Sequence, residues 1–181
     1  MTKDELRKLV RAEKKKVSLE EKKQRSEKIW QQLETDPKFV SASVVLLYWS
    51  MADEVYTHDF VQKWAQEKTL LLPVVDGDTL RIKPFTTIDN MVISEQFGIG
   101  EPIGDDYTNL SDIDVIIVPG VAFDRKKNRM GRGRGYYDRL LSTCDAHKIG
   151  VGFDFQLFDI VPTQPFDIPM DSVVTETEVF L

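Results

Sequence analysis

The sequence is poor in cysteine and histidine, and it has no long apolar run. Its 181 residues include one cysteine, Cys144, and two histidines. A single cysteine excludes a disulfide framework and a cysteine-rich metal site. The longest uninterrupted apolar run, 44–49, is six residues long, whereas a membrane-spanning helix needs about 20. The first residues also lack the apolar stretch of a signal peptide. We therefore expect a cytoplasmic protein with no membrane partner.

Positive charge is scarce over most of the chain and gathers in two segments. The formal net charge is −6, but residues 3–28 carry a local charge of +5 and residues 125–134 one of +6. The remaining residues together carry −17. A general nucleic-acid-binding domain is usually basic overall. The distribution argues against a nucleic-acid partner and indicates a compact anion site built from two places in the sequence.

The apolar periodicity alternates between helix and strand. Helical spacing covers the first 35 residues, where a capping box at Ser18 and Glu21 starts a second helix that 36–37 ends. One further helix is predicted to begin after Thr57, which can cap it, and another is predicted over 135–144. Short buried runs predict strands at 44–49, 69–75, 80–83, 114–118, 149–153, 173–174 and 179–180, with a hairpin turn at 76–77. Residues 86–110 have no clear period and are predicted to be loop with short elements.

Buried strands that alternate with helices through short connections are typical of an α/β protein. We expect a single Rossmann-like domain over 1–181, with three layers and a mainly parallel central sheet. Ligands of such sheets bind at the carboxyl ends of the strands.

The segment after the predicted strand 114–118 holds the most informative pattern. Glycines at 131, 133 and 135 let the backbone approach a phosphate closely. Arg132 and Arg134 offer planar forks for phosphate oxygens, and the rings of Tyr136 and Tyr137 can face a flat group. The spacing fits neither the Walker pattern nor the dinucleotide fingerprint.

The same residues also allow interpretations without a phosphate site or catalysis. The Arg-Gly tract can be a solvated loop or an RNA contact, so a non-catalytic nucleotide- or RNA-binding module is the alternative function. An acyl or CoA-type transferase would share the fold but has no evident nucleophile here. His58 and His147 are isolated from any second ligand, which favours a polar contact at a helix start and a surface role. Cys144 is expected to be a small buried residue.

Two other groups can be read in two ways. Lys3 and Arg7 lie four residues apart, on one helical face, as phosphate ligands or as an ordinary solvated face. Glu54 follows a predicted strand end, where its carboxylate can accept hydrogen bonds from a ring with N–H donors, and Trp49 and Met51 can form an apolar wall for that ring. The alternative is a core tryptophan followed by a polar loop.

The segments 123–124 and 129–138 together resemble the signature of the 5-formyltetrahydrofolate cyclo-ligase family, whose members are also called 5,10-methenyltetrahydrofolate synthetases. The resemblance extends to Lys3 and Arg7, to 49–55 and to 170–171, and so covers nearly the whole chain. Lys127 stands where the family often has glycine, which affects the shape of that turn, and Met130 where leucine is usual.

The resemblance implies a reaction and a set of ligands. The family converts 5-formyltetrahydrofolate to 5,10-methenyltetrahydrofolate with Mg²⁺ and ATP: the formyl oxygen attacks the γ-phosphate, the anilino nitrogen closes the ring, and ADP and phosphate are released. Such chemistry needs alignment and charge stabilisation more than acid–base groups. The implied small-molecule partners are ATP and the folate, bound by a monomer or by a weak dimer.

The resemblance also assigns residues. It implies that Arg132 and Arg134 are catalytic and that Asp138 and Asp171 hold Mg²⁺. The implied ATP contacts are Lys3, Arg7, Arg129, Met130, Gly131, Arg132, Gly133, Arg134, Gly135, Tyr136 and Tyr137. The implied folate contacts are Trp49, Met51, Glu54, Arg132, Gly133, Arg134, Gly135 and Tyr136.

Overall fold

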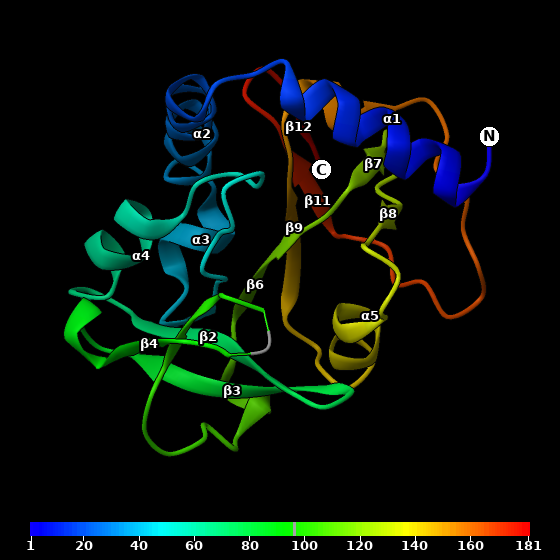
Figure 1. Ribbon diagram of the computed structural model, residues 1–181. Helices are drawn as coiled ribbons and strands as arrows, with labels where there is room; N and C mark the ends of the chain where they lie inside the picture. Colours follow the sequence, from blue (N-terminus) through cyan, green and yellow to red (C-terminus); the bar gives the residue numbers. More distant parts are fainter. Residues whose placement is uncertain (96) are drawn as a thin grey trace.

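A seven-stranded mixed sheet forms the centre of the protein (Figure 1). The computed structural model describes residues 1–95 and 97–181. The strand order is β12 (Val179–Phe180), β11 (Ser172–Val174), β9 (His147–Val151), β6 (Val115–Pro119), β1 (Val44–Leu46), β2 (Thr69–Asp76) and β3 (Thr79–Phe85). The four inner pairings are parallel, and the outermost pair on each side is antiparallel.

Helices cover both faces of this sheet. The helices α2 (Leu19–Leu33), α3 (Pro37–Ser41) and α4 (His58–Trp64) lie on one face, and α5 (Tyr136–Leu141) lies on the other (Figure 1). Because successive strand side chains point to opposite faces, Val45 packs with Trp30 and Phe60 while Leu46 packs with Leu140. The three-layer α/β arrangement with a mainly parallel sheet is confirmed.

The first helix, α1 (Lys3–Lys15), is separate from these layers. Thr2 and Glu5 form a capping box at its start. Its apolar side chains Leu6 and Val10 pack against Ala122 and Met130 of a smaller sheet. That sheet has the order β10 (Leu157–Phe158), β7 (Ala122–Asp124) and β8 (Arg129–Met130). The helix α1 therefore lies across the end of the main sheet where the glycine-rich segment begins (Figure 1).

Several predicted boundaries are wrong. The run 44–49 was expected to be one strand, but the strand ends at Leu46. The Leu47 N–H still donates to the carbonyl oxygen of Leu71 in β2, whereas the Tyr48 carbonyl oxygen accepts from a side chain instead of a neighbouring strand. Thr57 precedes α4 without capping it, since its hydroxyl donates to the Tyr48 carbonyl oxygen. Asp36 and Pro37 end α2 but also begin α3, with the Asp36 side chain as its cap.

The described part of the segment 86–110 is loop with short elements, as predicted. It contains the antiparallel pair β4 (Met91–Ile93) and β5 (Gly100–Pro102), with short 3₁₀ helices at Ile88–Asn90 and Leu110–Asp112. A third 3₁₀ helix spans Asp154–Gln156. No helix in the described part of the chain combines the length and apolarity needed to cross a bilayer.

Gly150 of β9 lies against the buried ring of Phe123. This contact packs the smaller sheet against the main one. A Cβ atom at Gly150 would be 2.5 Å from the Phe123 ring and 3.0 Å from the Met170 side chain. We expect Gly150→Ala to lower the free energy of unfolding by about 1–3 kcal/mol through overpacking. Thermal unfolding should show a fall of about 2–4 °C per kcal/mol. Adding Phe123→Leu should recover part of the loss, whereas an unchanged melting temperature in the single variant would contradict this packing argument.

Candidate active site

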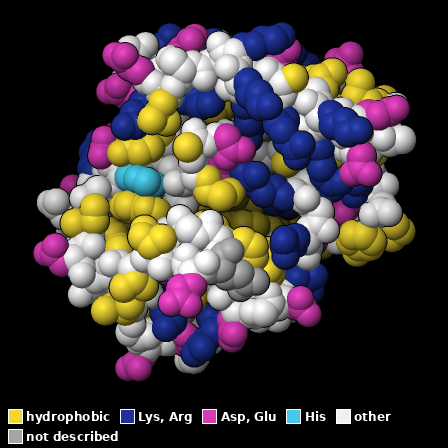
Figure 2. Space-filling model, viewed as in Figure 1, with side chains coloured by type: hydrophobic (Ala, Val, Ile, Leu, Met, Phe, Trp, Pro, Cys, Tyr) yellow, Lys and Arg dark blue, Asp and Glu magenta, His cyan; other side chains and the backbone are white. Residues whose placement is uncertain are grey.

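A cavity of about 710 Å³ opens at the carboxyl ends of the parallel strands. Its floor includes Pro119 at the end of β6 and Gly120 directly after it. Lys and Arg side chains of α1 and of the glycine-rich turn gather around a hollow with hydrophobic side chains at its centre (Figure 2). The cavity therefore joins a cationic rim to an apolar interior.

The two basic segments meet at the glycine-rich turn, residues 131–135. Arg7 of α1 donates from Nε to the carbonyl oxygen of Gly131 at 3.2 Å. Gly133 and Gly135 have left-handed backbones, with φ of 108° and 71°. A Cβ atom at Gly133 would lie 3.4 Å from the Arg7 guanidinium, an ordinary van der Waals contact, so the positive φ rather than crowding favours glycine there. Residues 124 positions apart thus form one cationic surface.

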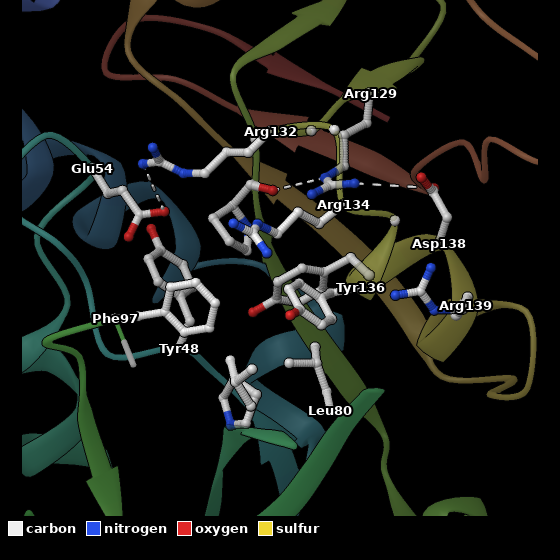
Figure 3. Close-up of a pocket in the computed structure, with 18 of the residues that line it drawn as sticks. Tyr48, Glu54, Leu80, Phe97, Arg129, Arg132, Arg134, Tyr136, Asp138 and Arg139 are labelled. Atoms are coloured by element: carbon white, nitrogen blue, oxygen red, sulfur yellow. Dashed lines mark hydrogen bonds and ion pairs between the residues drawn. The ribbon is translucent and has the colours of Figure 1, made fainter. Parts of the chain in front are cut away.

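Three arginines of the turn region differ in what holds them (Figure 3). Arg129 is buried, donates from Nε to the carbonyl oxygen of Pro119 at 2.7 Å, and lies over the Tyr137 ring. Arg132 pairs with Asp53, its Nη2 lying 2.9 Å from Oδ1. Arg134 lies over the ring of Phe97 and has no carboxylate within 4.0 Å in the described ranges. Of these three arginines, Arg134 is therefore the one that pairs with no described carboxylate.

Glu54 and Trp49 form the opposite end of the cavity. Glu54 accepts a hydrogen bond from the backbone N–H of Met51 at 2.8 Å, and burial raises the pKa of its carboxyl group. Trp49 stacks on His58 with ring centroids 3.8 Å apart. A ring nitrogen of His58 lies 2.9 Å from the carbonyl oxygen of Ser50, the polar contact predicted for a histidine at a helix start. This end offers a carboxylate acceptor beside aromatic surface.

The acidic residues at the cationic end differ from those predicted. Asp138 lines the cavity, accepts from the backbone N–H of Ile168 and lies 4.0 Å from Arg129. Asp171 does not line it: its carboxylate accepts from the backbone N–H of Lys148 at 2.8 Å, near the amino end of β9. The structure therefore does not bring Asp171 together with Asp138 in this cavity.

Asp167 takes the place in the cavity that was predicted for Asp171. Its carboxylate accepts from Lys3 Nζ at 2.7 Å and from the backbone N–H of Gln164 at 2.8 Å. Both Asp138 and Asp167 favour the charged form of the buried Arg129, whose pKa burial lowers. Sequence reasoning missed Asp167 because it stands four residues before Asp171 in the same irregular segment. No local pattern distinguishes the two.

The acidic pair fits a cation that arrives with its own oxygen ligands. Mg²⁺ usually keeps several waters and takes one or two carboxylates together with substrate phosphates. Asp138 and Asp167 supply two such carboxylates beside the cationic rim. Among residues 1–95 and 97–181, no group of three or more His, Cys, Asp or Glu side chains is placed to hold a metal ion. A Mg²⁺ ion held by these two carboxylates would therefore need phosphate or water oxygens as further ligands.

Most of the predicted site residues line the cavity, and Met130 is an exception besides Asp171. Met130 is almost fully buried in the cluster of Leu6 and Val10, because its side chain points to the opposite side of the short strand β8 from the cavity. The predicted residues that do line it are Lys3, Arg7, Trp49, Met51, Glu54, Arg129, Gly131, Arg132, Gly133, Arg134, Gly135, Tyr136, Tyr137 and Asp138.

One wall of the cavity carried no signal in the sequence. The β2–β3 hairpin and the segment before β5 supply apolar side chains to it, and the Tyr136 hydroxyl donates to the carbonyl oxygen of Gly77 at the hairpin tip at 2.8 Å. These apolar lining residues are Pro73, Val75, Leu80, Phe97 and Ile99, joined by Glu101 of β5 and Arg139 of α5. They complete a slot of mixed aromatic and aliphatic surface that suits a flat ring.

Comparison with known proteins gives a consistent result. The model of the 5-formyltetrahydrofolate cyclo-ligase family matches residues 1–176. The chain is 32% identical over 141 residues to 5-formyltetrahydrofolate cyclo-ligase of Haemophilus influenzae. This alignment covers 74% of this chain and 75% of that one. It is 29% identical to the enzyme of Escherichia coli K12, over 95% of this chain and 99% of that one.

A solved structure agrees in fold over almost the full length. The NMR structure of 5,10-methenyltetrahydrofolate synthetase from Aquifex aeolicus superimposes with a TM-score of 0.88 and 39% identity, covering 99% of this chain and 92% of that one. The glycine-rich turn, the two basic segments that meet there and the match over residues 1–176 lead to one assignment. The chain belongs to the 5-formyltetrahydrofolate cyclo-ligase family and is an enzyme of the ligase class.

Proposed function

We propose that this enzyme uses ATP to convert 5-formyltetrahydrofolate into 5,10-methenyltetrahydrofolate, with release of ADP and phosphate. The observation that carries the proposal is the polarity of a single cavity. Lys3, Arg7 and Arg129 lie at one end, and Glu54 with Trp49 at the other. Arg134 projects between these ends (Figure 3). A triphosphate at the first end and a pterin ring at the second would bring their reacting atoms together near Arg134.

The reaction proceeds in two displacements. The formyl oxygen attacks the γ-phosphorus of ATP, and the bond to the bridging oxygen breaks to release ADP. The formyl oxygen then carries the phosphoryl group and is a good leaving group. The anilino nitrogen attacks the formyl carbon and loses its proton, and the carbon–oxygen bond breaks to release phosphate and leave the methenyl bridge. Catalysis depends mainly on alignment and on stabilising charge at the moving phosphoryl group.

Each end of the cavity has a role in that alignment. Lys3, Arg7 and Arg129, with the backbone of the glycine-rich turn, bind the phosphates of ATP. Glu54 accepts hydrogen bonds from the pterin N–H groups, and Trp49 and Met51 face the ring. Arg132 and Arg134 counter the charge on the transferring phosphoryl group. Asp138 and Asp167 would hold a Mg²⁺ ion that binds with ATP, and the ion would further neutralise phosphate charge.

The direct test of activity is spectroscopic. Purified protein is mixed with 5-formyltetrahydrofolate and Mg-ATP, and the absorbance of methenyltetrahydrofolate is followed in the near ultraviolet. We expect an increase that requires both ATP and Mg²⁺ and that releases one phosphate for each product formed. A folded protein that gives no ATP-dependent increase would contradict the proposed function.

The Mg²⁺ dependence tests the acidic residues at the cationic end. We expect Asp138→Asn to raise the Mg²⁺ concentration for half-maximal turnover by roughly tenfold, the scale of losing one supporting group at a metal site. The matched control is Asp171→Asn, whose amide oxygen can still accept from the Lys148 N–H. Turnover is measured across a Mg²⁺ titration for both. A larger effect of Asp171→Asn than of Asp138→Asn would contradict this assignment.

The pH dependence tests the role of Glu54. Burial raises the pKa of this carboxyl group above the ordinary 4.5, and only the charged form accepts hydrogen bonds with both oxygens. Affinity for the folate is therefore complete above the raised pKa and is lost as the pH falls through it. We expect kcat/KM for the folate to decrease on the acid side at a higher pH than an ordinary glutamate would give. An identical acid limb in Glu54→Gln would contradict the assignment to Glu54.

We infer that residues 1–181 form one domain, since the main sheet joins strands from β1 near the start to β12 near the end. We place the enzyme in the cytoplasm, where ATP is available, and expect a monomer with at most weak dimerisation. Sedimentation of the purified protein across a concentration series tests the oligomeric state.

A further inference from the structure

Lys14 is a buried cation near the end of α1. Its side chain is 7% exposed, and its Nζ lies 3.6 Å from Asp53 Oδ2. Burial lowers the pKa of Lys14, although the nearby Asp53 favours the charged form. A buried lysine is rare without a partner of opposite charge. Neither Lys14 nor Asp53 lines the cavity, and the Asp53 side chain is 43% exposed, so this pair lies outside the cavity.

Asp53 connects Lys14 to the cavity through Arg132. Its Oδ1 and Oδ2 atoms lie 2.9 Å and 3.2 Å from Nη2 of Arg132. The same Nη2 is 3.7 Å from Oε2 of Glu54, which does line the cavity. Burial would raise the pKa of Asp53, but the attraction of Lys14 and Arg132 lowers it overall. The four groups form a chain of alternating charge that ends at the proposed pterin site.

The position of Lys14 on α1 relates it to Arg7. The two residues are seven apart, which is about two helical turns, so both lie on the same face of the helix. Arg7 contacts the carbonyl oxygen of Gly131, and Lys14 reaches Arg132 through Asp53. One face of α1 thus holds two consecutive residues of the glycine-rich turn, one directly and one through a carboxylate.

Asp53 alone would be an imperfect support for Arg132. Arg132 and Asp53 are 48% and 43% exposed, so the carboxylate at 2.9 Å orients the guanidinium and, screened by solvent, cancels part of its charge. A second cation behind the carboxylate offsets that cancellation while the hydrogen bonds stay in place. Arg132 then keeps both a fixed orientation and a charge available to the phosphoryl group, which is the preorganisation that lowers a barrier.

We propose that Lys14 is a positioning residue that acts through Asp53, holding Arg132 beside Glu54 while offsetting the negative charge of Asp53. The inference rests on the proposed function, because Arg132 is taken to stabilise the transferring phosphoryl group. It adds a residue outside the cavity to the groups on which turnover depends.

A double-mutant cycle tests this arrangement. The variants are Lys14→Met, Asp53→Asn and their combination, with Lys14→Arg as the charge-conserving variant and the exposed Lys15→Met as the matched control. We expect Lys14→Met and Asp53→Asn each to lower kcat about tenfold, with the KM for ATP and for the folate within about twofold. Lys14→Arg and Lys15→Met should keep kcat within about twofold.

The combined variant separates positioning from general stability. If Lys14 acts through Asp53, adding Lys14→Met to Asp53→Asn lowers kcat no further, even if the melting temperature falls in both. Independent, multiplicative losses of kcat would overturn the proposal, as would an Asp53→Asn variant with unchanged kcat. This last comparison needs no folded Lys14→Met protein. Wild-type protein without turnover would instead refute the proposed function, and the inference with it.

Discussion

Replacing Arg134 by alanine is expected to lower kcat about 10³-fold while the melting temperature changes by no more than a few degrees. The guanidinium of Arg134 has no carboxylate partner among residues 1–95 and 97–181 and is supported by the face of the Phe97 ring, 5.1 Å away. Its loss removes charge stabilisation at the phosphoryl group, for which arginine contributes effects of this size. Little packing is lost with it. Stopped assays at saturating ATP and folate measure kcat, and circular dichroism measures the melting temperature.

Two controls make the Arg134 result specific. Arg134→Lys keeps the charge but not the planar fork, so we expect it to recover part of the lost kcat. Arg125→Ala changes an arginine of the same basic segment that pairs with Glu178 instead and does not line the cavity; its kcat should stay within about twofold. Equal losses in Arg125→Ala and Arg134→Ala would point to general electrostatics and would contradict a specific role for Arg134.

Replacing Glu54 by glutamine is expected to raise the KM for 5-formyltetrahydrofolate about 10²-fold, with the KM for ATP within about threefold. A charged acceptor for buried N–H donors contributes about 1.5–3 kcal/mol, and tenfold in affinity corresponds to about 1.4 kcal/mol. Glutamine has almost the same shape and can still accept from the Met51 N–H. Steady-state kinetics with each substrate varied in turn measure both KM values.

The same experiment distinguishes a folate role from a structural one. Glu54 also lies 3.7 Å from Arg132, so its loss could disturb the turn. In that case kcat and the KM for ATP would change together with the KM for the folate. The exposed Glu67→Gln is the matched control for removing one carboxylate. A KM for the folate that is unchanged in Glu54→Gln would contradict the proposed pterin contact.

The sequence predicted the parts of the fold and site that local patterns encode. Buried runs such as 69–75 and 114–118 form strands of the central sheet, on either side of β1, because they are apolar on both faces. The glycine–arginine segment predicted a turn where the backbone and guanidinium groups face one cavity. The family assignment removes the alternative of a non-catalytic RNA-binding module. Each of these features depends on residues close together in the chain.

The features that were missed depend on contacts between distant residues. Asp167 and Asp171 look alike in sequence, and only the pairing of Lys3 with Asp167 distinguishes the one in the cavity. Phe97 enters the site because the β4–β5 segment lies beside Arg134, within a stretch that has no apolar period. Met130 was placed with its glycine neighbours, but its position on β8 turns its side chain into the core. Strand direction and tertiary pairing, rather than residue type, decide such positions.

The most direct test of the account follows the formyl oxygen. In the proposed reaction this oxygen attacks the γ-phosphorus and leaves with the phosphate. The enzyme is given 5-formyltetrahydrofolate labelled with ¹⁸O in the formyl group together with unlabelled Mg-ATP, and the released phosphate is analysed by mass spectrometry. We predict one ¹⁸O atom in each phosphate released during ring closure. Phosphate without the label, formed while methenyltetrahydrofolate accumulates, would contradict the account.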